Sequence, residues 1–258
     1  MYTDTHCHLD MIDGHPSDEL IDRALEAEVS TLLTVGVDLA SSAESVQTAS
    51  AHPAVWAVVG IHPHNAIEAT EHVLQRLSGL AQHPRVVGIG ETGLDYFRDH
   101  SPHDRQEQSF REHIRMAKEH DRALVIHCRE AHEDTLRVLG DEQAPERTVF
   151  HCFSGDVWFA KICAREGWYA SFSGTVTFKN APELRAAAKV MPVELLLTET
   201  DSPYLSPHPH RGQMNEPARV PLIAAQLASI HGLEPEEMGW RTSANARAAF
   251  GLPDTSAS

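Results

Sequence analysis

The sequence has few basic residues, few cysteines and no long apolar run. Its 258 residues include 21 Lys and Arg against 37 Asp and Glu, which gives a formal net charge of −16. This balance excludes a protein that coats DNA without sequence preference, because such binding depends on basic side chains that neutralise phosphates. No stretch approaches the roughly 18 apolar residues that a membrane-spanning helix needs, so we expect no membrane contact.

The few cysteines indicate a reducing environment. Cys7, Cys128, Cys152 and Cys163 lack the paired spacing of a disulfide framework. The first residues also lack a basic region followed by an apolar signal core. We therefore expect free thiols and a cytoplasmic protein.

The chain instead contains a regular alternation of two kinds of segment. Apolar residues make up 41% of it, enough to bury a core. Amphipathic stretches such as 17–25, 104–120, 218–231 and 235–250 alternate with short apolar or β-branched runs. The expected strands are 2–7, 30–37, 55–61, 85–91, 122–127, 147–152, 168–173 and 193–199.

This alternation predicts the fold class. Eight units of about 32 residues each are close to a minimal βαβ repeat. Strict alternation predicts a parallel α/β sheet, and eight units predict its closure into a TIM (β/α)8 barrel. No break in composition divides the chain, so we expect one domain over residues 1–251 and a loose tail over 252–258.

The first expected strand contains a possible metal-binding pair. Asp4, His6 and His8 occupy alternate positions, so their side chains should point to one face. His6 and His8 could then chelate one ion. A His-x-His pair can also arise by chance among 18 histidines, so this pattern alone is not decisive.

Further possible ligands stand where other expected strands end. The carboxyl ends of barrel strands converge on one mouth, where active sites are built. Six such groups are too many for one tetrahedral ion with an open position, but they suit two ions that share a bridge. A carboxylate has two oxygens, so Glu91 fits the bridge, and Asp201 can bind one ion and accept a proton from the attacking water. The six are His6, His8, Glu91, His127, His151 and Asp201.

The acidic net charge would repel a phosphate substrate, but the expected charge of the metal site has the opposite sign. Two divalent ions would contribute about +4 and the two carboxylates about −2, so the site would attract a phosphate with about +2. Imidazole ligands favour Zn, Mn, Co or Ni, whereas Mg prefers oxygen ligands and is a possible alternative.

Several segments together resemble the TatD family of metal-dependent deoxyribonucleases. The matching segments are 3–9 (TDTHCHL), 60–64 (GIHPH), 90–96 (GETGLDY), 127–129 (HCR), 151–155 (HCFSG), 199–205 (ETDSPYL), 211–212 (RG), 215–217 (NEP) and 245–250. The resemblance covers nearly all of 1–251 and implies a metallo-dependent TIM-barrel hydrolase of the amidohydrolase type that acts on DNA as an exonuclease. It implies that the six residues above bind metal and that His62 and Arg129 lie near the scissile phosphate.

We therefore expect two-metal hydrolysis of DNA or an oligonucleotide, with no obligate protein partner. Two alternatives stay open. The substrate could be a small phosphoester, lactone or cyclic amide, which is favoured by the acidic surface and by Gln213, where the family often has basic residues. The protein could also be a metal-binding scaffold without catalysis, although such a scaffold usually lacks a ligand and none is missing here.

Other polar residues have simpler interpretations. Cys7, Cys128 and Cys152 each follow or precede a proposed ligand and are expected to be buried filler that points away from the site. Glu199 is expected to support a ligand from behind. Arg129 could pair with Glu130 or Glu133, but its position two residues after His127 favours the substrate. The histidines expected to be ordinary solvated residues are His64, His113, His120, His132, His208 and His210.

Overall fold

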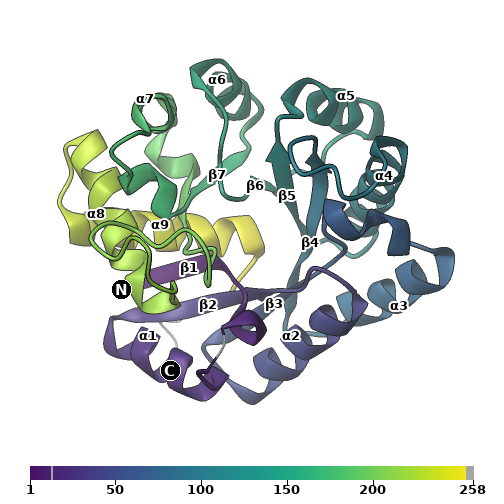
Figure 1. Cartoon of the computed structure of the whole chain (residues 1–258), viewed down its shortest axis with the longest axis horizontal. Coiled ribbons are helices and arrows are strands. Elements are labelled where there is room, and N and C mark those ends of the chain that lie inside the picture. Colours follow the sequence, from purple (N-terminus) through teal and green to yellow (C-terminus); the bar gives the residue numbers. More distant parts are fainter. Residues whose placement is uncertain (13, 254–258) are drawn as a thin grey trace.

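The computed structural model describes residues 1–12 and 14–253, and over these residues eight parallel strands form one sheet in chain order. Figure 1 shows the strands arranged around a common centre with helices outside them. The segment after β8 lies against β1, where Asp201 N donates to His6 O (2.9 Å) and His8 N donates to Ser202 O (2.8 Å). The expected TIM barrel is confirmed, in a nearly closed form. The strands are β1 Tyr2–Cys7, β2 Val29–Val35, β3 Val55–Val59, β4 Val86–Asp95, β5 Ala123–Arg129, β6 Thr148–Phe150, β7 Tyr169–Phe172 and β8 Leu196–Thr198.

The helices begin where their sequences supply caps. Asp38 and Ser41 form a capping box at α2, and the side chains of Thr70 and Asp156 accept from backbone N–H groups at α3 and α6. The stretches expected at 17–25, 104–120 and 235–250 match α1, α4 and α9 to within one residue. The helices are α1 Ser17–Glu26, α2 Leu39–Ala51, α3 Glu71–Ala81, α4 His103–Glu119, α5 His132–Glu142, α6 Val157–Glu166, α7 Pro182–Val190, α8 Val220–His231 and α9 Pro235–Phe250. Short 3-10 turns lie at Leu9–Met11, Pro63–Glu68, Gly174–Thr177, Val193–Leu195 and Pro217–Arg219.

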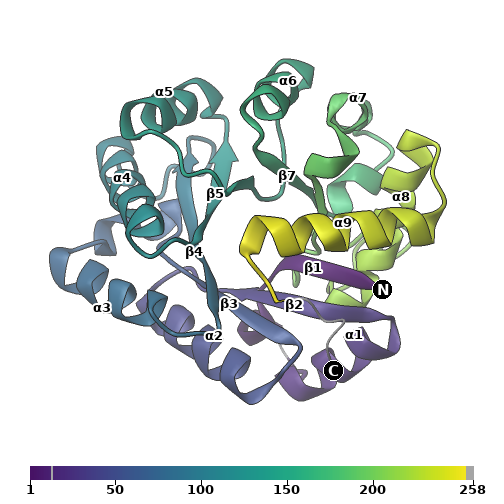
Figure 2. The same ribbon diagram turned by 180° about the vertical axis from the view of Figure 1, so that it is seen from behind.

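The interior of the barrel is filled from the strands and closed at one end by α9. Leu33, Val58 and Val125, from three different strands, belong to the same buried cluster as Phe250 of α9. Asn245 of α9 donates to the carbonyls of Val193 (2.7 Å) and Leu196 (2.8 Å), at the start of β8. Figure 2 shows α9 crossing the barrel on the side opposite to the view of Figure 1. The amino-terminal mouth is therefore covered, and the carboxyl-terminal mouth is left to the loops.

Strand β4 is longer than expected. It continues past the predicted end at Glu91 to Asp95, and its register against β5 shifts between Ile89 and Thr92. Gly93 has φ +135°, and a Cβ there would meet the backbone carbonyl of His127. Only glycine allows the two strands to approach this closely. The extension carries β4 side chains to the same height as the end of β5.

Two further expectations concern the start of β8 and the C-terminal tail. The segment 193–195, expected as strand, is a 3-10 turn that follows Pro192, so β8 begins at Leu196. Residues 254–258 of the expected loose tail lie outside the described residues, but Leu252 is only 9% exposed and packs with Phe250. Within the described part of the chain, no helix combines the length and the apolar character needed to cross a membrane.

Candidate metal centre

The six residues expected to bind metal converge at the carboxyl-terminal mouth. They come from the end of β1 and the residue after it, from the middle of β4, from the end of β5 and from the residues that follow β6 and β8. Four of them are almost fully buried, and the side chains of His127 and Asp201 are 16% and 14% exposed. A site so enclosed but still reachable from the mouth is typical of a reaction centre. The six are His6, His8, Glu91, His127, His151 and Asp201.

Glu91 lies between two groups of imidazoles. Its Oε1 atom is 2.8 Å from Nδ1 of His127 and 2.6 Å from Nε2 of His151. Its Oε2 atom is 3.4 Å from Nε2 of His6 and 3.9 Å from Nε2 of His8. Each oxygen of one carboxylate therefore faces a separate pair of ring nitrogens, which is the arrangement a bridging ligand needs.

The spacing within each pair fits a shared ion. The Nε2 atoms of His6 and His8 are 3.3 Å apart, and Nδ1 of His127 is 3.3 Å from Nε2 of His151. Two nitrogens bound to one tetrahedral zinc at its usual bond length would be about 3.3 Å apart. Asp201 Oδ1 lies 3.6 Å from Nε2 of His8, at the first pair. We call His6, His8 and Asp201 the first subsite, and His127 and His151 the second.

Hydrogen bonds behind the rings set their tautomers. Nδ1 of His8 donates to the carbonyl of Val35 (2.8 Å), and Nε2 of His127 donates to Oδ2 of Asp95 (3.0 Å). When such a ring is neutral and its one proton faces this partner, its other nitrogen presents a lone pair to a bound ion. Such partners orient metal-binding histidines and raise their basicity.

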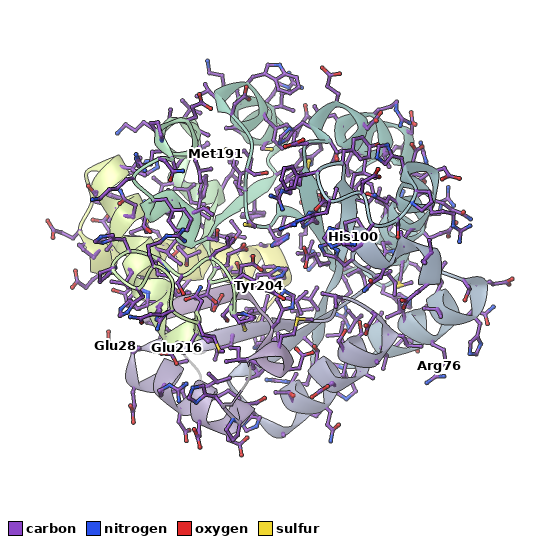
Figure 3. The ribbon with its side chains drawn as sticks, in the orientation of Figure 1. Glu28, Arg76, His100, Met191, Tyr204 and Glu216 are labelled. Carbon is purple, nitrogen blue, oxygen red and sulfur yellow. The ribbon has the colours of Figure 1, made fainter. Side chains whose placement is uncertain are left out.

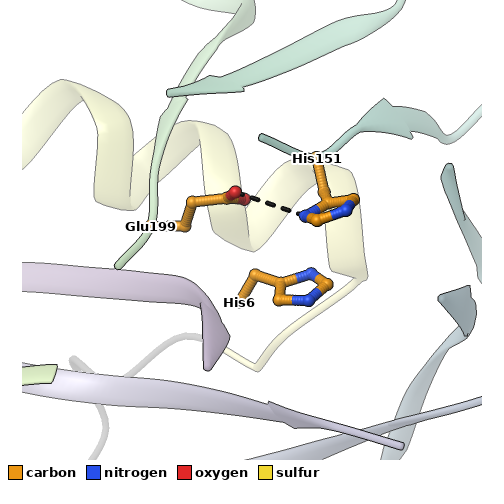
Figure 4. A group of neighbouring side chains, drawn as sticks. All are labelled: His6, His151 and Glu199. Carbon is orange, nitrogen blue, oxygen red and sulfur yellow. Dashed lines mark ion pairs between the residues drawn. The ribbon is translucent and has the colours of Figure 1, made fainter. Parts of the chain in front are cut away.

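Glu199 forms an ion pair with the third ring, that of His151. Figure 4 shows Glu199 beside His151, where Oε1 lies 3.3 Å from Nδ1, on the side of the ring away from Glu91. The same oxygen accepts from the backbone N–H of Cys152 (2.6 Å). The ring of His6 stacks on that of His151 at 3.9 Å. The expected supporting position of Glu199 agrees with this geometry.

The pKa directions follow from this crowding of charge. Burial by itself would raise the pKa of Glu91, but the surrounding imidazoles, His151 first, hold it well below its usual range. Burial opposes protonation of His151, but the carboxylates of Glu91 and Glu199 raise its pKa well above the usual value. Burial is also outweighed at Asp201, where the neighbouring imidazoles, His8 first, lower the pKa. Both carboxylates are therefore anions that require a cation beside them.

His62 also faces Glu91, with Nε2 3.3 Å from Oε1. Its position allows it to join Glu91 and His127 around an ion. However, its Nδ1 atom accepts from the backbone N–H of His64 (3.0 Å), and burial lowers its pKa to about 4. A neutral ring whose Nδ1 accepts must carry its proton on Nε2. In this state His62 is a hydrogen-bond donor at the edge of the centre.

Arg129 lies at the mouth without an acidic partner. Among the described residues, no carboxylate lies within 4.0 Å of its guanidinium, so the alternative pairing with Glu130 or Glu133 is not observed. The guanidinium instead stacks on the ring of Phe97, 4.0 Å from its centroid. Arg129 is free to bind an anion.

Two residues of this site were missed by the sequence argument. Asp95 is fully buried, and its Oδ2 atom is 3.0 Å from Nε2 of both His127 and His64. His64 was expected to be an ordinary loop residue, whereas it lies against this carboxylate. The sequence does place an acidic residue, Asp95, four positions after Glu91. Because the strand was expected to end at Glu91, this residue could not be assigned to the site.

Simple alternation does not describe β1. The register against β2 shifts between Asp4 and Cys7. The carboxylate of Asp4 accepts from Thr200 and from the backbone N–H of His6, outside the groups that could hold an ion. His6 and His8 reach the centre, but Asp4 does not accompany them as expected.

The remaining expectations have mixed outcomes. The cysteines are free, and in the described part of the chain none joins a group that could hold a metal. His113 was expected on the surface but is fully buried: Nε2 accepts from Ile61 N (3.0 Å) and Nδ1 donates to Ser109 O (2.7 Å). The sequence did not indicate this buried position, because both hydrogen-bond partners of His113 are backbone groups, which every residue carries.

Comparison with known proteins gives consistent matches along the chain. The family model for TatD related DNases matches residues 3–251. The uncharacterized metal-dependent hydrolase TatD of Mycobacterium tuberculosis is 43% identical over 258 residues, covering 96% of this chain and 97% of that protein. The 3'-5' ssDNA/RNA exonuclease TatD of Citrobacter rodentium is 36% identical, covering 91% and 92%. The crystal structure of YJJV, a TatD homologue from Escherichia coli, has a TM-score of 0.91 at 28% identity and 98% coverage of both chains.

Proposed function

The chain belongs to the TatD related DNase family and is of the metal-dependent hydrolase type, and from this membership we propose that it cleaves phosphodiester bonds of DNA as an exonuclease. The observation that carries the proposal is Glu91, whose two oxygens each face a separate pair of imidazole nitrogens. The exonuclease name of the relative from Citrobacter rodentium supports a nucleic acid as the substrate.

The residues present fit a pair of divalent ions. The first subsite and Glu91 would hold one ion, and the second subsite and Glu91 would hold the other. Nitrogen ligands favour Zn, Mn, Co or Ni, and Mg is the alternative. When bound, such a pair lowers the pKa of a water molecule and offsets negative charge on phosphoryl oxygens.

The protein's own groups would perform the other parts of the reaction. Asp201, an anion 14% exposed at the mouth, accepts the proton of the attacking water. His62 donates from Nε2, and Arg129 donates from its guanidinium, to phosphoryl oxygens whose charge grows as the bond breaks. Glu91 keeps the two subsites at a fixed separation. Asp95, Glu199 and Val35 hold the rings of His127, His151 and His8 from behind.

A substrate panel tests this function. The metal-loaded protein is incubated with 5′-labelled single-stranded DNA and with a small nitrophenyl phosphodiester, each with and without a chelator. We expect a ladder of products shortened from one end, a strong preference for the polymer, and complete loss of turnover on chelation. Turnover that survives metal removal would overturn the mechanism, and absence of metal-dependent turnover on any substrate would leave a binding scaffold.

A small-molecule substrate is the second candidate. The net charge of −16 and the exposed Gln213 and Met214 in the loop after β8 favour it, because they weaken attraction of a polyanion. Equal or better turnover of the small phosphodiester than of DNA would select this candidate.

The four free thiols support the expected cytoplasmic location.

A further inference from the structure

Two exposed aromatic rings flank the metal centre. Tyr204 is 55% exposed, and its ring centroid is 6.4 Å from that of His8, in the first subsite. Phe97 is 50% exposed, and its backbone N–H donates to Asp95 (3.0 Å), the residue that supports His127 of the second subsite. One ring therefore stands beside each subsite.

The loops that carry these rings approach the mouth from different sides. Tyr204 belongs to the loop after β8, and its backbone N–H donates to the carbonyl of Asp201 (2.9 Å). Phe97 belongs to the loop after β4, as does His100, whose ring lies 4.6 Å from that of His64. Figure 3 shows Tyr204 near the middle of the barrel and His100 to one side of it, toward β4. A chain bound across the centre would pass from one ring to the other.

Positive charge gathers at the Phe97 ring. The guanidinium of Arg129 lies 4.0 Å from the ring centroid and that of Arg98 lies 5.6 Å from it. In the described part of the chain, neither has a carboxylate within 4.0 Å, whereas Arg111 and Arg137 each lie within 2.8 Å of one. In a chain with a net charge of −16, two unopposed arginines around one exposed ring mark a place for an anion that also carries a flat ring.

The same combination recurs across the mouth. Arg211, in the loop after β8, stacks on Phe178, in the loop after β7, at 3.6 Å from the ring centroid. Among the described residues it too lacks a carboxylate within 4.0 Å, so a second pair of an arginine and an aromatic ring lies on the loops after β7 and β8. Aromatic rings interleaved with arginines are the means by which proteins hold single-stranded nucleic acids, since bases stack on the rings and guanidinium groups bind the phosphates.

We propose that Phe97 and Tyr204 bind bases of the substrate by stacking, one ring on either side of the cleaved phosphate, while Arg98 and Arg129 bind its backbone. This inference rests on the proposed function, because it assigns residues that hold the substrate of the same site. A base stacked on each ring adds binding that a phosphodiester without bases cannot receive.

The test uses two substrates that differ only in their bases. One is a single-stranded DNA oligonucleotide, and the other is an oligonucleotide of equal length made of abasic sites, with the same phosphates. The quantity measured is the ratio of kcat/KM for the first substrate to kcat/KM for the second. We expect the substitutions Phe97→Ala and Tyr204→Ala each to lower this ratio roughly 5- to 100-fold, the range of one lost base stack. Phe97→Trp, which keeps a ring, should retain it.

Trp240→Ala provides a matched control. Trp240 is an aromatic residue of α9 that is 61% exposed, on the helix that covers the opposite mouth. Its removal should leave the ratio unchanged. In addition, Arg98→Gln should lower the slope of log KM against log salt concentration by about 0.7, the value for one contact with a phosphate of a single strand.

The outcomes separate the two proposals. If the wild-type protein cleaves neither oligonucleotide, the proposed function fails, and the inference fails with it. If the wild-type protein cleaves DNA but either ring variant keeps the full ratio, the stacking of a base on that ring is overturned while the nuclease function stands. The melting temperature of each variant shows whether it is folded, so a result from a misfolded protein is recognised.

Discussion

Asp95 holds His127 from behind: its Oδ2 atom lies 3.0 Å from Nε2 of His127, while Nδ1 on the opposite side of the ring lies 2.8 Å from Glu91. Asp95 is fully buried, and although burial opposes its ionisation, the hydrogen bond from His127 lowers its pKa below the usual range. It is therefore a buried anion that keeps the His127 proton on Nε2. The orientation of a proposed ligand thus depends on a residue outside the six.

Substitution of this partner should weaken metal binding without unfolding the protein. The Oδ1 atom of Asp95 accepts from the backbone N–H groups of Phe97 (3.0 Å) and Arg98 (2.8 Å). Asp95→Asn keeps that acceptor but places an NH2 group against His127, which drives the ring proton to Nδ1. We expect metal affinity to fall about 10- to 100-fold, as for other lost partners of ligand histidines.

Competition with a chelator measures this affinity. Asp121→Asn is the matched control, because the side chain of Asp121 is 96% exposed. An Asp95→Asn variant with wild-type metal affinity would show that Asp95 does not orient His127.

Glu91 should determine how many ions bind. Glu91→Gln removes the charge that both subsites share, so we expect fewer than two equivalents of metal and a loss of turnover of at least about 100-fold, the scale of one lost electrostatic partner in a reaction centre. Glu91→Ala should lose metal and activity together. Elemental analysis and turnover on the same samples check this. Full turnover in either variant would exclude the bridging role.

His62 should act on the substrate and not on the metal. Because its proton is held on Nε2, His62→Gln is expected to lower kcat roughly 100- to 1000-fold, the effect of one lost donor to a developing oxyanion. The metal content should stay at the wild-type value. If the variant instead loses one equivalent of metal, His62 is a ligand of the second ion, and its assignment as a donor is wrong.

His113 should make stability depend on pH. Burial lowers its pKa to about 4 in the folded protein, against an ordinary value of 6.5 for histidine. The unfolded chain therefore binds the proton first as pH falls, and the folded state loses stability between about pH 6.5 and pH 4. At about 1.4 kcal/mol per pKa unit, this loss is on the order of 3 kcal/mol.

Urea unfolding at pH 7 and at pH 4.5 measures the loss, with chelator present at both pH values so that metal release does not contribute. His113→Gln cannot titrate, so its free energy of unfolding should fall less over this range than that of the wild type. Equal falls in the two proteins would contradict the prediction.

Local patterns predicted the elements of the fold well. The helices α1, α4 and α9 begin and end within one residue of the expected ranges, because their amphipathic repeats and first-turn signals are properties of neighbouring residues. The shared mouth of His6, Glu91, His127 and Asp201 also followed from sequence, since the carboxyl ends of parallel barrel strands must meet.

Contacts between distant segments could not be predicted in this way. The extension of β4 to Asp95 depends on the close approach of Gly93 to the backbone of His127, 34 residues later in the chain. The burial of His113 depends on the backbone of Ile61, which lies 52 residues away. Nothing in the sequence around Gly93 or His113 indicates which distant segment it will contact.

The order of residues therefore determined the alternating strands and helices, the barrel and the six proposed ligands, because each follows from periodicity along one segment and from the geometry of parallel strands. Tertiary structure alone decided which oxygen of Glu91 faces which imidazoles, which nitrogen of each ring carries the proton, and which aromatic rings stand beside the centre. These relationships depend on distances of about 3 Å between strands and loops, and such distances are set by packing of the whole barrel.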